Sequence, residues 1–148
     1  MEKQIFNKSP LKLDFHFFPS LHIVANQNLD PAELNSAEHF EDYDIETEVN
    51  ILRNENDPFN FQITLEIKYD NIELKKAYEF ELKIVGFFNI DKNQKDDQFE
   101  KCVNILGPSI LYGAAREFLL TITNRGPYPP VYLPTVSFVP AIDNSQEE

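Results

Sequence analysis

The chain has 148 residues and a formal net charge of −12, from 25 acidic and 13 basic side chains. A chain of this length is typical of one domain and can bury roughly 68–70% of its unfolded surface. Its 42% hydrophobic and 13% aromatic residues predict a folded core. Nucleic acid is excluded as a partner because its phosphates require Lys and Arg, and an anionic membrane would repel the chain. The acidic charge favours basic partners or serves solubility alone.

The cysteine content and the N-terminus indicate where the protein works. The one cysteine, Cys102, cannot form an intramolecular disulfide, which fits a reducing compartment. The N-terminal residues lack an apolar signal core, and no run approaches transmembrane length. We therefore expect a cytoplasmic protein with one domain over residues 1–148, in which residues 1–9 and 140–148 are flexible.

The first predicted element is a strand over residues 11–17, ended or bent near Pro19. Its apolar residues alternate with polar ones, and Leu21 and Ile23 can continue it. Residues 25–41 are polar and lack periodicity, so we expect a loop there, with a helical turn around residues 31–34. The alternating apolar residues are Leu11, Leu13, Phe15 and Phe17.

Three more strands are predicted over residues 43–52, 59–69 and 72–90. Asp70-Asn71 is a natural tight turn between the last two. Each strand alternates apolar and polar residues, which is typical of an antiparallel sheet with one buried face. At the end of the last strand, Val85 and Phe87 make the second face apolar as well, and Gly86 marks a bulge or a close backbone approach.

A helix is predicted to begin near Asp96, with a break or restart at Gly107-Pro108 and a second piece over residues 108–123. In that piece Leu111, Ala114, Ala115, Phe118 and Ile122 form one apolar stripe, and other apolar residues lie outside it. A helix that is apolar nearly all round is buried on more than one side, and a second subunit is the simplest cover. The predicted oligomer interface consists of Leu111, Phe118, Leu119, Leu120 and Ile122.

The segment after this helix begins with Asn124-Arg125-Gly126, a stop signal that precedes Pro127. Prolines 127, 129, 130, 134 and 140 keep the rest extended. Tyr128 and Tyr132 place aromatic rings in this proline-rich arm.

Residues that could carry out catalysis are sparse. His16, His22 and His39 are scattered without metal-ligand spacing, and the four glycines form no phosphate-binding loop. Cys102 has no histidine near it in the sequence and is expected to be a packing residue. We expect no enzyme activity, no metal and no cofactor.

Apolar residues in unusual places are the main functional signal. Val85, Phe87 and Phe88 lie at the end of the sheet, and the apolar helix and the tyrosines of the arm come after them in the chain. All of them could pack inside a monomer or dimer. Together they also fit an aromatic groove for extended, non-native chains.

Several segments between residues 80 and 138 resemble the SecB export chaperones. Residues 108–112 (PSILY) with 115–117 (ARE) resemble the entry into that family's long helix. Arg125-Gly126, Tyr128-Pro129 and Leu133 resemble its crossover loop, and residues 136–138 (VSF) resemble the segment just after that loop. Residues 86–90 (GFFNI) resemble the end of its fourth strand.

The resemblance implies an α+β fold with a four-stranded antiparallel sheet, a long helix and a proline-rich crossover loop, assembled as a homo-tetramer (a dimer of dimers). It implies ATP-independent holding of unfolded polypeptides, with clients bound near the crossover loop. By position, the implied client-binding residues are Phe87, Phe88, Tyr112, Tyr128 and Tyr132. The wet acidic sheet face, with Asp44, Glu46 and Glu48, is the implied docking face for the translocase motor SecA.

Two departures from the family pattern keep alternatives open. The usual first-strand motif around the acidic docking residues is missing, and Pro140 argues against the family's C-terminal helix. These departures favour a SecB-like chaperone dedicated to one partner, such as the antitoxin of a toxin–antitoxin module, over a general export chaperone. A non-chaperone assembly protein that reuses the fold is the third hypothesis.

Overall fold

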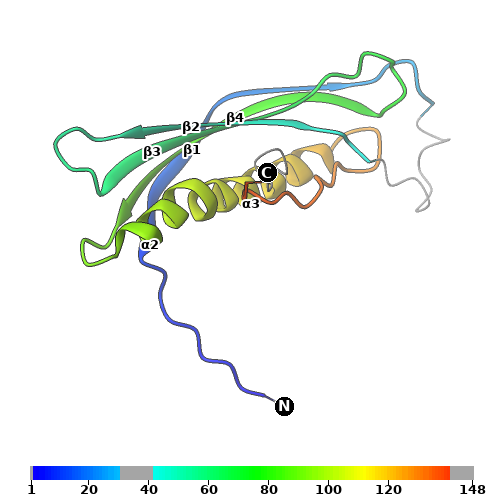
Figure 1. Ribbon diagram of the computed structural model, residues 1–148. Helices are drawn as coiled ribbons and strands as arrows, with labels where there is room; N and C mark the ends of the chain where they lie inside the picture. Colours follow the sequence, from blue (N-terminus) through cyan, green and yellow to red (C-terminus); the bar gives the residue numbers. More distant parts are fainter. Residues whose placement is uncertain (1, 31–41, 141–148) are drawn as a thin grey trace, which may run out of the picture.

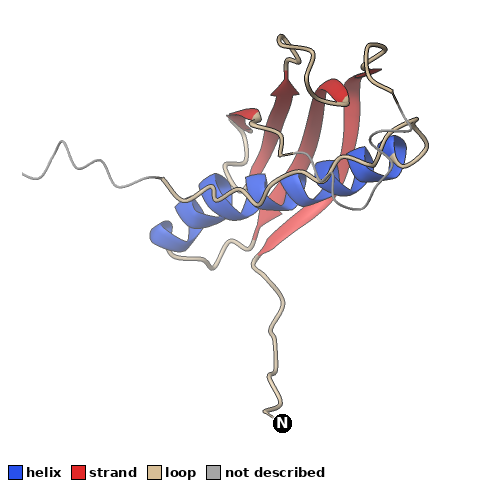
Figure 2. Ribbon diagram, turned by 90° about the vertical axis from the view of Figure 1, so that its right-hand side faces the viewer, coloured by secondary structure: helices blue, strands red, loops and turns tan. Residues whose placement is uncertain are grey.

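The computed structural model describes residues 2–30 and 42–140. Four strands form one antiparallel sheet in the order β1-β4-β3-β2. One long helical stretch lies across a single face of this sheet, and the chain after it returns along the helix (Figures 1 and 2). The predicted α+β class with a four-stranded antiparallel sheet is confirmed. The elements are β1 (Leu11–Ala25), β2 (Glu46–Arg53), β3 (Asn60–Tyr69), β4 (Tyr78–Ile90), α2 (Asp96–Lys101), η1 (Cys102–Leu106) and α3 (Gly107–Thr123).

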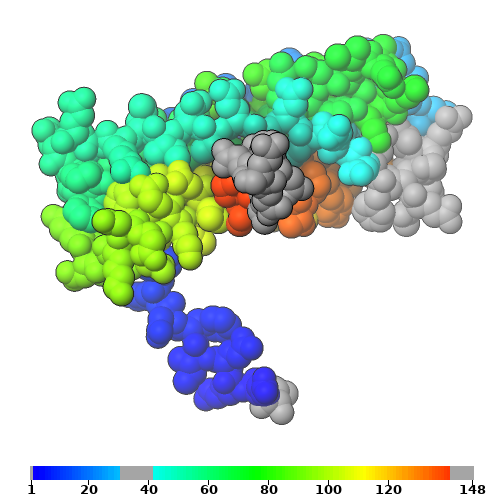
Figure 3. All heavy atoms as spheres, viewed as in Figure 1, coloured from blue at the N-terminus to red at the C-terminus, as the bar shows by residue number. Residues whose placement is uncertain are grey.

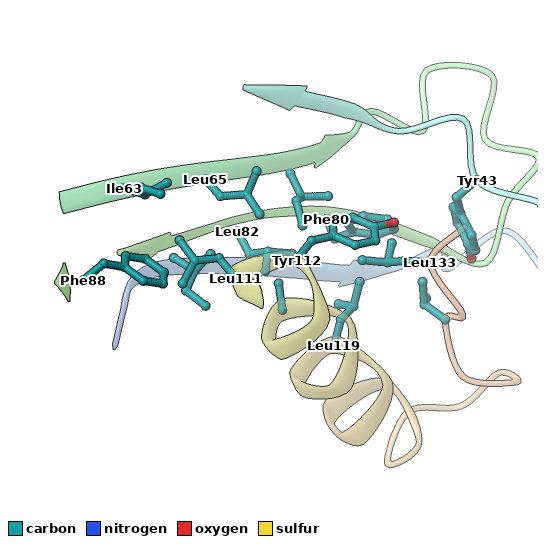
Figure 4. Close-up of a cluster of buried hydrophobic side chains, with 14 of the residues drawn as sticks. Tyr43, Ile63, Leu65, Phe80, Leu82, Phe88, Leu111, Tyr112, Leu119 and Leu133 are labelled. Carbon is teal, nitrogen blue, oxygen red and sulfur yellow. The ribbon is translucent and has the colours of Figure 1, made fainter. Parts of the chain in front are cut away.

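The hydrophobic core lies between the sheet and α3 (Figure 4). In β3 and β4, alternate residues are buried toward the helix, because successive side chains of a strand point to opposite faces. Gly86 of β4 lies directly under the helix. A Cβ atom there would be 2.6 Å from Cδ2 of Leu111, so a larger residue would push this side chain aside, and the close approach that the sequence suggested at this position is present. The fully buried side chains of these strands include Ile63, Leu65, Ile67, Phe80, Leu82 and Ile84.

The connection between β3 and β4 differs from the prediction. The last strand begins at Tyr78 and not at residue 72, and residues 70–77 form a loop. The Nδ2 group of Asn26 donates to the carbonyls of Leu74 and Lys76, at 2.8 and 2.9 Å. Asn71 also donates from its side chain to Lys76, at 2.8 Å. These bonds hold the alternating residues in a loop, in which Leu74 adopts a left-handed φ of 54°.

The edge strand β1 is longer and less regular than predicted. It continues through Pro19, with register shifts between Leu13 and Phe15 and between Phe17 and Ser20. The first shift turns Phe15 and Phe17 to the face opposite the helix, where they pair with Phe87 and Val85. A regular alternation would have kept all four apolar residues of the segment on one face. Proline is tolerated here because the strand lies at an edge and bulges.

The predicted break at Gly107-Pro108 is absent, and the helix is continuous. The five residues Cys102–Leu106 form a π-helical turn, and Leu106 and Gly107 keep right-handed helical dihedrals. A proline ring in an ordinary α-helix clashes with the carbonyl of the residue four positions earlier. The wider π-helical turn just before Pro108 relieves that clash, so α2 and α3 join without a break.

The face that α3 turns to the sheet is rotated from the predicted stripe. The buried row consists of Leu111, Ala115, Leu119 and Thr123, with Tyr112 beside it. These residues recur every four positions, and such a row is inclined to the helix axis. The helix accordingly crosses the strands obliquely, as Figure 2 shows. The predicted stripe was drawn from helical spacing alone, and it wrongly placed Leu119 outside the buried face.

The helical stretch Asp96–Thr123, at 28 residues, is long and apolar enough for a membrane span by length and composition. The expectation that no run approaches that length was wrong. The core helix of a soluble protein meets the same criteria, so the finding is weak by itself. In this fold one side of the stretch packs on the sheet, which accounts for part of its apolar character.

Candidate functional site

The side of α3 that faces away from the sheet is partly apolar. Leu106 and Ile110 are 42% and 39% exposed, and Leu120 is half-buried on the same side. Gly113 lies between them, and a Cβ there would meet nothing within 4 Å. Residues at these spacings share one helix face. Glu117 lies on this same face between Gly113 and Leu120, so the outward stripe is apolar on either side of one exposed acidic residue.

Three side chains tie the segment after α3 to the body. The Tyr128 hydroxyl donates to the backbone carbonyl of Asn26, and its ring packs edge-on against Tyr78 at 5.8 Å. Thr123 Oγ1 accepts a hydrogen bond from the Val131 N–H at 2.9 Å and donates to the Leu119 carbonyl at 2.7 Å. These bonds fix the start of the proline-rich arm against the end of the helix.

Gly126 lets Tyr78 approach the turn that ends α3. A Cβ atom at this position would lie 1.9 Å from the Tyr78 hydroxyl oxygen. That hydroxyl donates to the Thr123 carbonyl and accepts from the Tyr128 N–H, both at 3.4 Å. The glycine that the sequence marked as a helix stop is therefore required for close packing.

Tyr112 anchors the later part of the arm. Its hydroxyl donates to the Pro134 carbonyl, and its ring lies edge-on to Phe138 at 5.9 Å. Burial raises the pKa of Tyr112, and burial likewise raises the pKa of Tyr78. The arm is thus hydrogen-bonded to a neutral tyrosine hydroxyl near its start, from Tyr78, and to another in its later part, from Tyr112.

The surface of the described part of the chain has a hollow of about 390 Å³ and another of about 350 Å³. The smaller of these opens where α3 meets the arm, and it joins the outward stripe of the helix to the outer side of the arm. Tyr132 is 47% exposed at its edge. Its lining residues are Leu120, Thr121, Asn124, Arg125, Pro130 and Tyr132.

The structure separates the five predicted client-binding residues. Phe88, Tyr112 and Tyr128 are 1%, 5% and 6% exposed, so they belong to the core of the isolated chain. Tyr132 lines the hollow between α3 and the arm. Phe87 lies on the opposite side of the sheet, beside Phe15. The structure therefore does not bring the five together at one surface.

The predicted oligomer interface is divided in the same way. Leu111 and Leu119 are fully buried against the sheet. Phe118 is half-buried and stacks on Phe18 of β1, with ring centroids 4.1 Å apart. Leu120 and Ile122 are half-buried. Only these last three present area that a second subunit could cover.

An aromatic cluster that the sequence reading missed lies on the sheet face opposite the helix. The rings of Phe15 and Phe87 stack with centroids 4.6 Å apart, and Phe17 lies 6.3 Å from Phe87. Phe15 and Phe17 are 56% and 45% exposed. The signal for this outer-face aromatic cluster was the apolar second face at Val85 and Phe87. Its other half depends on the bulge in β1, which the residue pattern does not reveal.

The predicted docking residues lie toward the other end of the same outer face. Glu46 and Glu48 of β2 line a shallow hollow with Glu66, Lys68 and Glu81, while Asp44 precedes the strand and is exposed. Glu48 lies directly across from Glu66, a like-charge pair that Lys83 offsets by binding Glu66 at 2.8 Å. The hydrogen bond to Glu66 raises the pKa of Lys83. This end of the face is thus charged and solvated.

In the described part of the chain, no group of three or more His, Cys, Asp or Glu side chains could hold a metal ion. Cys102 is buried, and its burial raises the pKa of the thiol. A thiol in this position is a poor nucleophile.

Comparison with known proteins places the chain in a family. A sequence model described as preprotein translocase subunit SecB matches residues 28–148. The chain belongs to the SecB family. The SecB protein of Cellvibrio japonicus is 30% identical over 112 residues, which cover 70% of this chain and 65% of that protein. SecB 1 of Polaromonas naphthalenivorans is 32% identical over 89 residues, 60% of this chain and 57% of that protein.

Other SecB relatives match at similar levels. SecB of Anaplasma phagocytophilum is 27% identical over 81 residues, 53% of this chain and 51% of that protein. The chain thus spans just over half the length of some SecB relatives that it matches. A SecB-like chaperone of Mycobacterium tuberculosis, solved in complex with a ChAD peptide from the HigA1 antitoxin, superposes with a TM-score of 0.63 at 14% identity, covering 86% of this chain and 91% of that one. This likeness shows the shared fold.

Proposed function

We propose that this chain is an ATP-independent chaperone that holds unfolded or non-native polypeptides for protein export. Membership of the SecB family supports the export role, since the curated relatives are named protein-export proteins. The observation that carries the holding role is the hollow in which Leu120 of α3 meets Pro130 and Tyr132 of the arm. The recess combines the apolar and aromatic side chains of Leu120, Pro130 and Tyr132 with the polar Thr121, Asn124 and Arg125, a mixture that suits an extended segment of varied sequence.

Within this proposal, Tyr132 contacts the client directly, and Leu120 forms the floor of the recess. Tyr112 and Tyr128 do not contact the client in this proposal. They position the arm that carries Tyr132, because their hydroxyls donate hydrogen bonds to backbone carbonyls. Affinity comes from apolar area removed from water, at about 25 cal/mol per Å², less the ordering entropy of the client. Several shallow sites on one client raise avidity without high affinity at each.

Assembly into a homo-tetramer, a dimer of dimers, is part of the same proposal. The outward stripe of η1 and α3 supports it, because Leu106, Ile110 and Leu120 would lose solvent contact in a helix-to-helix interface that also covers Glu117. Asp44, Glu46 and Glu48 remain the proposed docking residues for SecA, supported by their exposed position on the outer sheet face. We propose a cytoplasmic protein without enzyme activity.

A second candidate is a chaperone dedicated to one partner, such as an antitoxin. It is favoured by the fold shared with a SecB-like chaperone that was solved with an antitoxin peptide. The two candidates differ in breadth: an export chaperone suppresses aggregation of unrelated unfolded proteins, and a dedicated chaperone protects one chain.

The test is an aggregation assay with a chemically unfolded model protein, without nucleotide, monitored by light scattering. Suppression at near-stoichiometric amounts is expected, and its loss in Tyr132→Asp would assign the recess. The matched control is Val139→Asp, which charges an apolar residue of similar exposure, 59% against 47%, outside the recess. Equal suppression by both variants would remove the recess from the proposal, and no suppression by the parent chain would leave only a dedicated partner or a role in assembly.

A further inference from the structure

The outer-face aromatic cluster borders a hollow of about 390 Å³ at one end of the sheet. Phe15 and Phe87 form one wall, and Leu52 of β2, 65% exposed, stands across from them. In the register of the sheet, Leu52 pairs with Gln62, Gln62 with Phe87 and Phe87 with Phe15, so these side chains lie in one row across the strands. The row is apolar at both ends and has the amide of Gln62 in the middle, and Asp14, Arg53, Asn54 and Asn60 complete the lining of the hollow.

A second exposed apolar feature belongs to the same chain. Residues 2–9 form an extended arm that projects from the body (Figures 1 and 3). Ile5 and Phe6 on this arm are 85% and 83% exposed, and Lys3 and Lys8 flank them. Two large apolar side chains on an arm and the exposed Phe15 and Leu52 on a sheet are both unfavourable in water, and burying one pair against the other removes both from water.

We propose that the N-terminal arm of one copy docks on the outer-face aromatic cluster of a second copy. Ile5 and Phe6 enter the hollow between Phe15, Phe87 and Leu52. The proposal does not depend on the chaperone activity, since it concerns the face opposite the recess between α3 and the C-terminal arm.

Charge favours this occupant. The arm carries two lysines against the single acid Glu2, whereas the chain as a whole has a net charge of −12. The lining of the hollow holds one acid, Asp14, and one base, Arg53. Arg53 already pairs with Glu100 at 3.1 Å, whereas Asp14 has Lys12 only at 3.7 Å, so Asp14 is the group open to an arm lysine. Opposite charge at the rim guides an extended segment into an apolar site and sets its register.

The geometry at the base of the N-terminal arm favours docking on a second copy over docking on the sheet of the same chain. The Pro10 carbonyl accepts a hydrogen bond from the Asp91 N–H at 3.1 Å, and the Ser9 hydroxyl accepts one from the Leu11 N–H at 3.2 Å. Proline fixes its own φ and keeps the preceding residue extended, so a tight reversal at this point is disfavoured. The arm therefore leaves on the helix side of the sheet, away from its own outer face (Figure 1).

The decisive experiment mixes two single-cysteine additions to the full chain, Phe6→Cys in one preparation and Leu52→Cys in the other. Both positions are exposed, at 83% and 65%, so neither change removes a core side chain, and the native Cys102 is buried. Under a mildly oxidising glutathione buffer, the mixture is expected to form a disulfide-linked heterodimer. The control mixture pairs Phe6→Cys with Ile72→Cys, a site in the loop between β3 and β4 that is more accessible than Leu52 (85% against 65% exposed), so random collision alone would favour the control.

A several-fold excess of the 6–52 heterodimer over the 6–72 heterodimer supports the proposal, and equal yields or no product overturn it. A cross-link that forms only within a chain carrying both Phe6→Cys and Leu52→Cys, and not in the mixture, also overturns it, because the arm would then occupy its own sheet. As a second readout, a labelled peptide of residues 1–10 should bind the full chain. We expect at least a fivefold loss of affinity in Phe15→Ser and none in Ile110→Ser; equal affinities would contradict the assignment.

Discussion

The side-chain hydroxyl of Thr123 accepts a hydrogen bond from the backbone N–H of Val131 at 2.9 Å, although both residues are almost fully buried. This contact joins the last turn of α3 to the arm that doubles back along it. The arm has no strand partner over residues 129–138, so its backbone groups depend on such individual contacts. The small side chain of Thr123 thus stabilises the arm through a buried hydrogen bond and not through buried apolar area.

Thr123→Val keeps the shape of the side chain and removes the acceptor. The Val131 N–H would then be buried without a partner, which costs about 1–3 kcal/mol. Urea unfolding monitored by circular dichroism should show this loss, together with faster amide exchange at Val131. Thr121→Val is the control, because the Thr121 hydroxyl is exposed and bonds only the Glu117 carbonyl within its own helix. Similar losses in the two variants would contradict the role assigned to Thr123.

Gly126→Ala should destabilise the chain for steric reasons alone. The φ angle of Gly126 is not positive, so alanine fits the backbone, yet its Cβ would lie 1.9 Å from the Tyr78 hydroxyl. We expect a cost of about 1–3 kcal/mol in the free energy of unfolding. Tyr78→Phe removes the clashing oxygen, so the double variant should lose less stability than the sum of the two single variants. Strict additivity in the double-mutant cycle would refute this explanation.

Adjacent leucines in α3 should respond to charge in different ways. Leu119 is fully buried, so Leu119→Asp is expected to cost at least ~3 kcal/mol and to unfold the chain. Leu120 is half-buried and faces away from the sheet, so Leu120→Asp should leave the circular dichroism spectrum intact and lower the assembly state in analytical ultracentrifugation. A tetramer that persists in Leu120→Asp would contradict the helix-to-helix interface.

Alkaline pH should lower the stability of the folded chain through two buried tyrosines. Burial raises the pKa of Tyr78 and Tyr112 above their ordinary value of 10.0, because ionisation is costly inside the protein. The unfolded chain therefore loses these protons first. Their contribution to stability is complete below pH 10.0 and falls as the pH rises toward the folded-state values.

The measurement is the urea midpoint as a function of pH between neutral and strongly alkaline buffer. Tyr112→Phe should lower the midpoint at neutral pH, because the bond to Pro134 is lost, and should flatten the alkaline decline. Tyr132→Phe removes a hydroxyl from a side chain that is 47% exposed, and it serves as the control. An unchanged slope in Tyr112→Phe would mean that another group governs the decline.

The sequence predicts the elements whose pattern is local. The alternation over residues 59–69 is confirmed by β3, and the apolar run after Asp96 by the helix. The start of β4 could not be found this way, since the side chain that holds Leu74 in a loop is Asn26, 48 residues away. Only the folded chain brings those two residues together.

The sequence could predict which types of residue form the candidate site, but it could not predict how the fold arranges them. Tyr112, Tyr128 and Tyr132 have the same aromatic character in the sequence, yet two hydroxyls find buried carbonyls and the third lies at a surface recess. Likewise, the side of α3 that faces the sheet depends on the oblique path of the helix across the strands. A helical repeat in the sequence does not reveal that path. The bulge that turns Phe15 outward leaves no mark in the residue pattern.

The bent edge of β1 limits how the sheet can grow. A long edge strand offers a row of unpaired backbone groups to any extended chain, and stacking of that kind leads to fibres. Pro19 has no N–H to donate, and the two register shifts around it interrupt the straight ladder that an added strand would need. An incoming chain can pair with part of this edge but cannot extend along all of it. This edge of the sheet can thus stay open while resisting endless, amyloid-like addition of further copies.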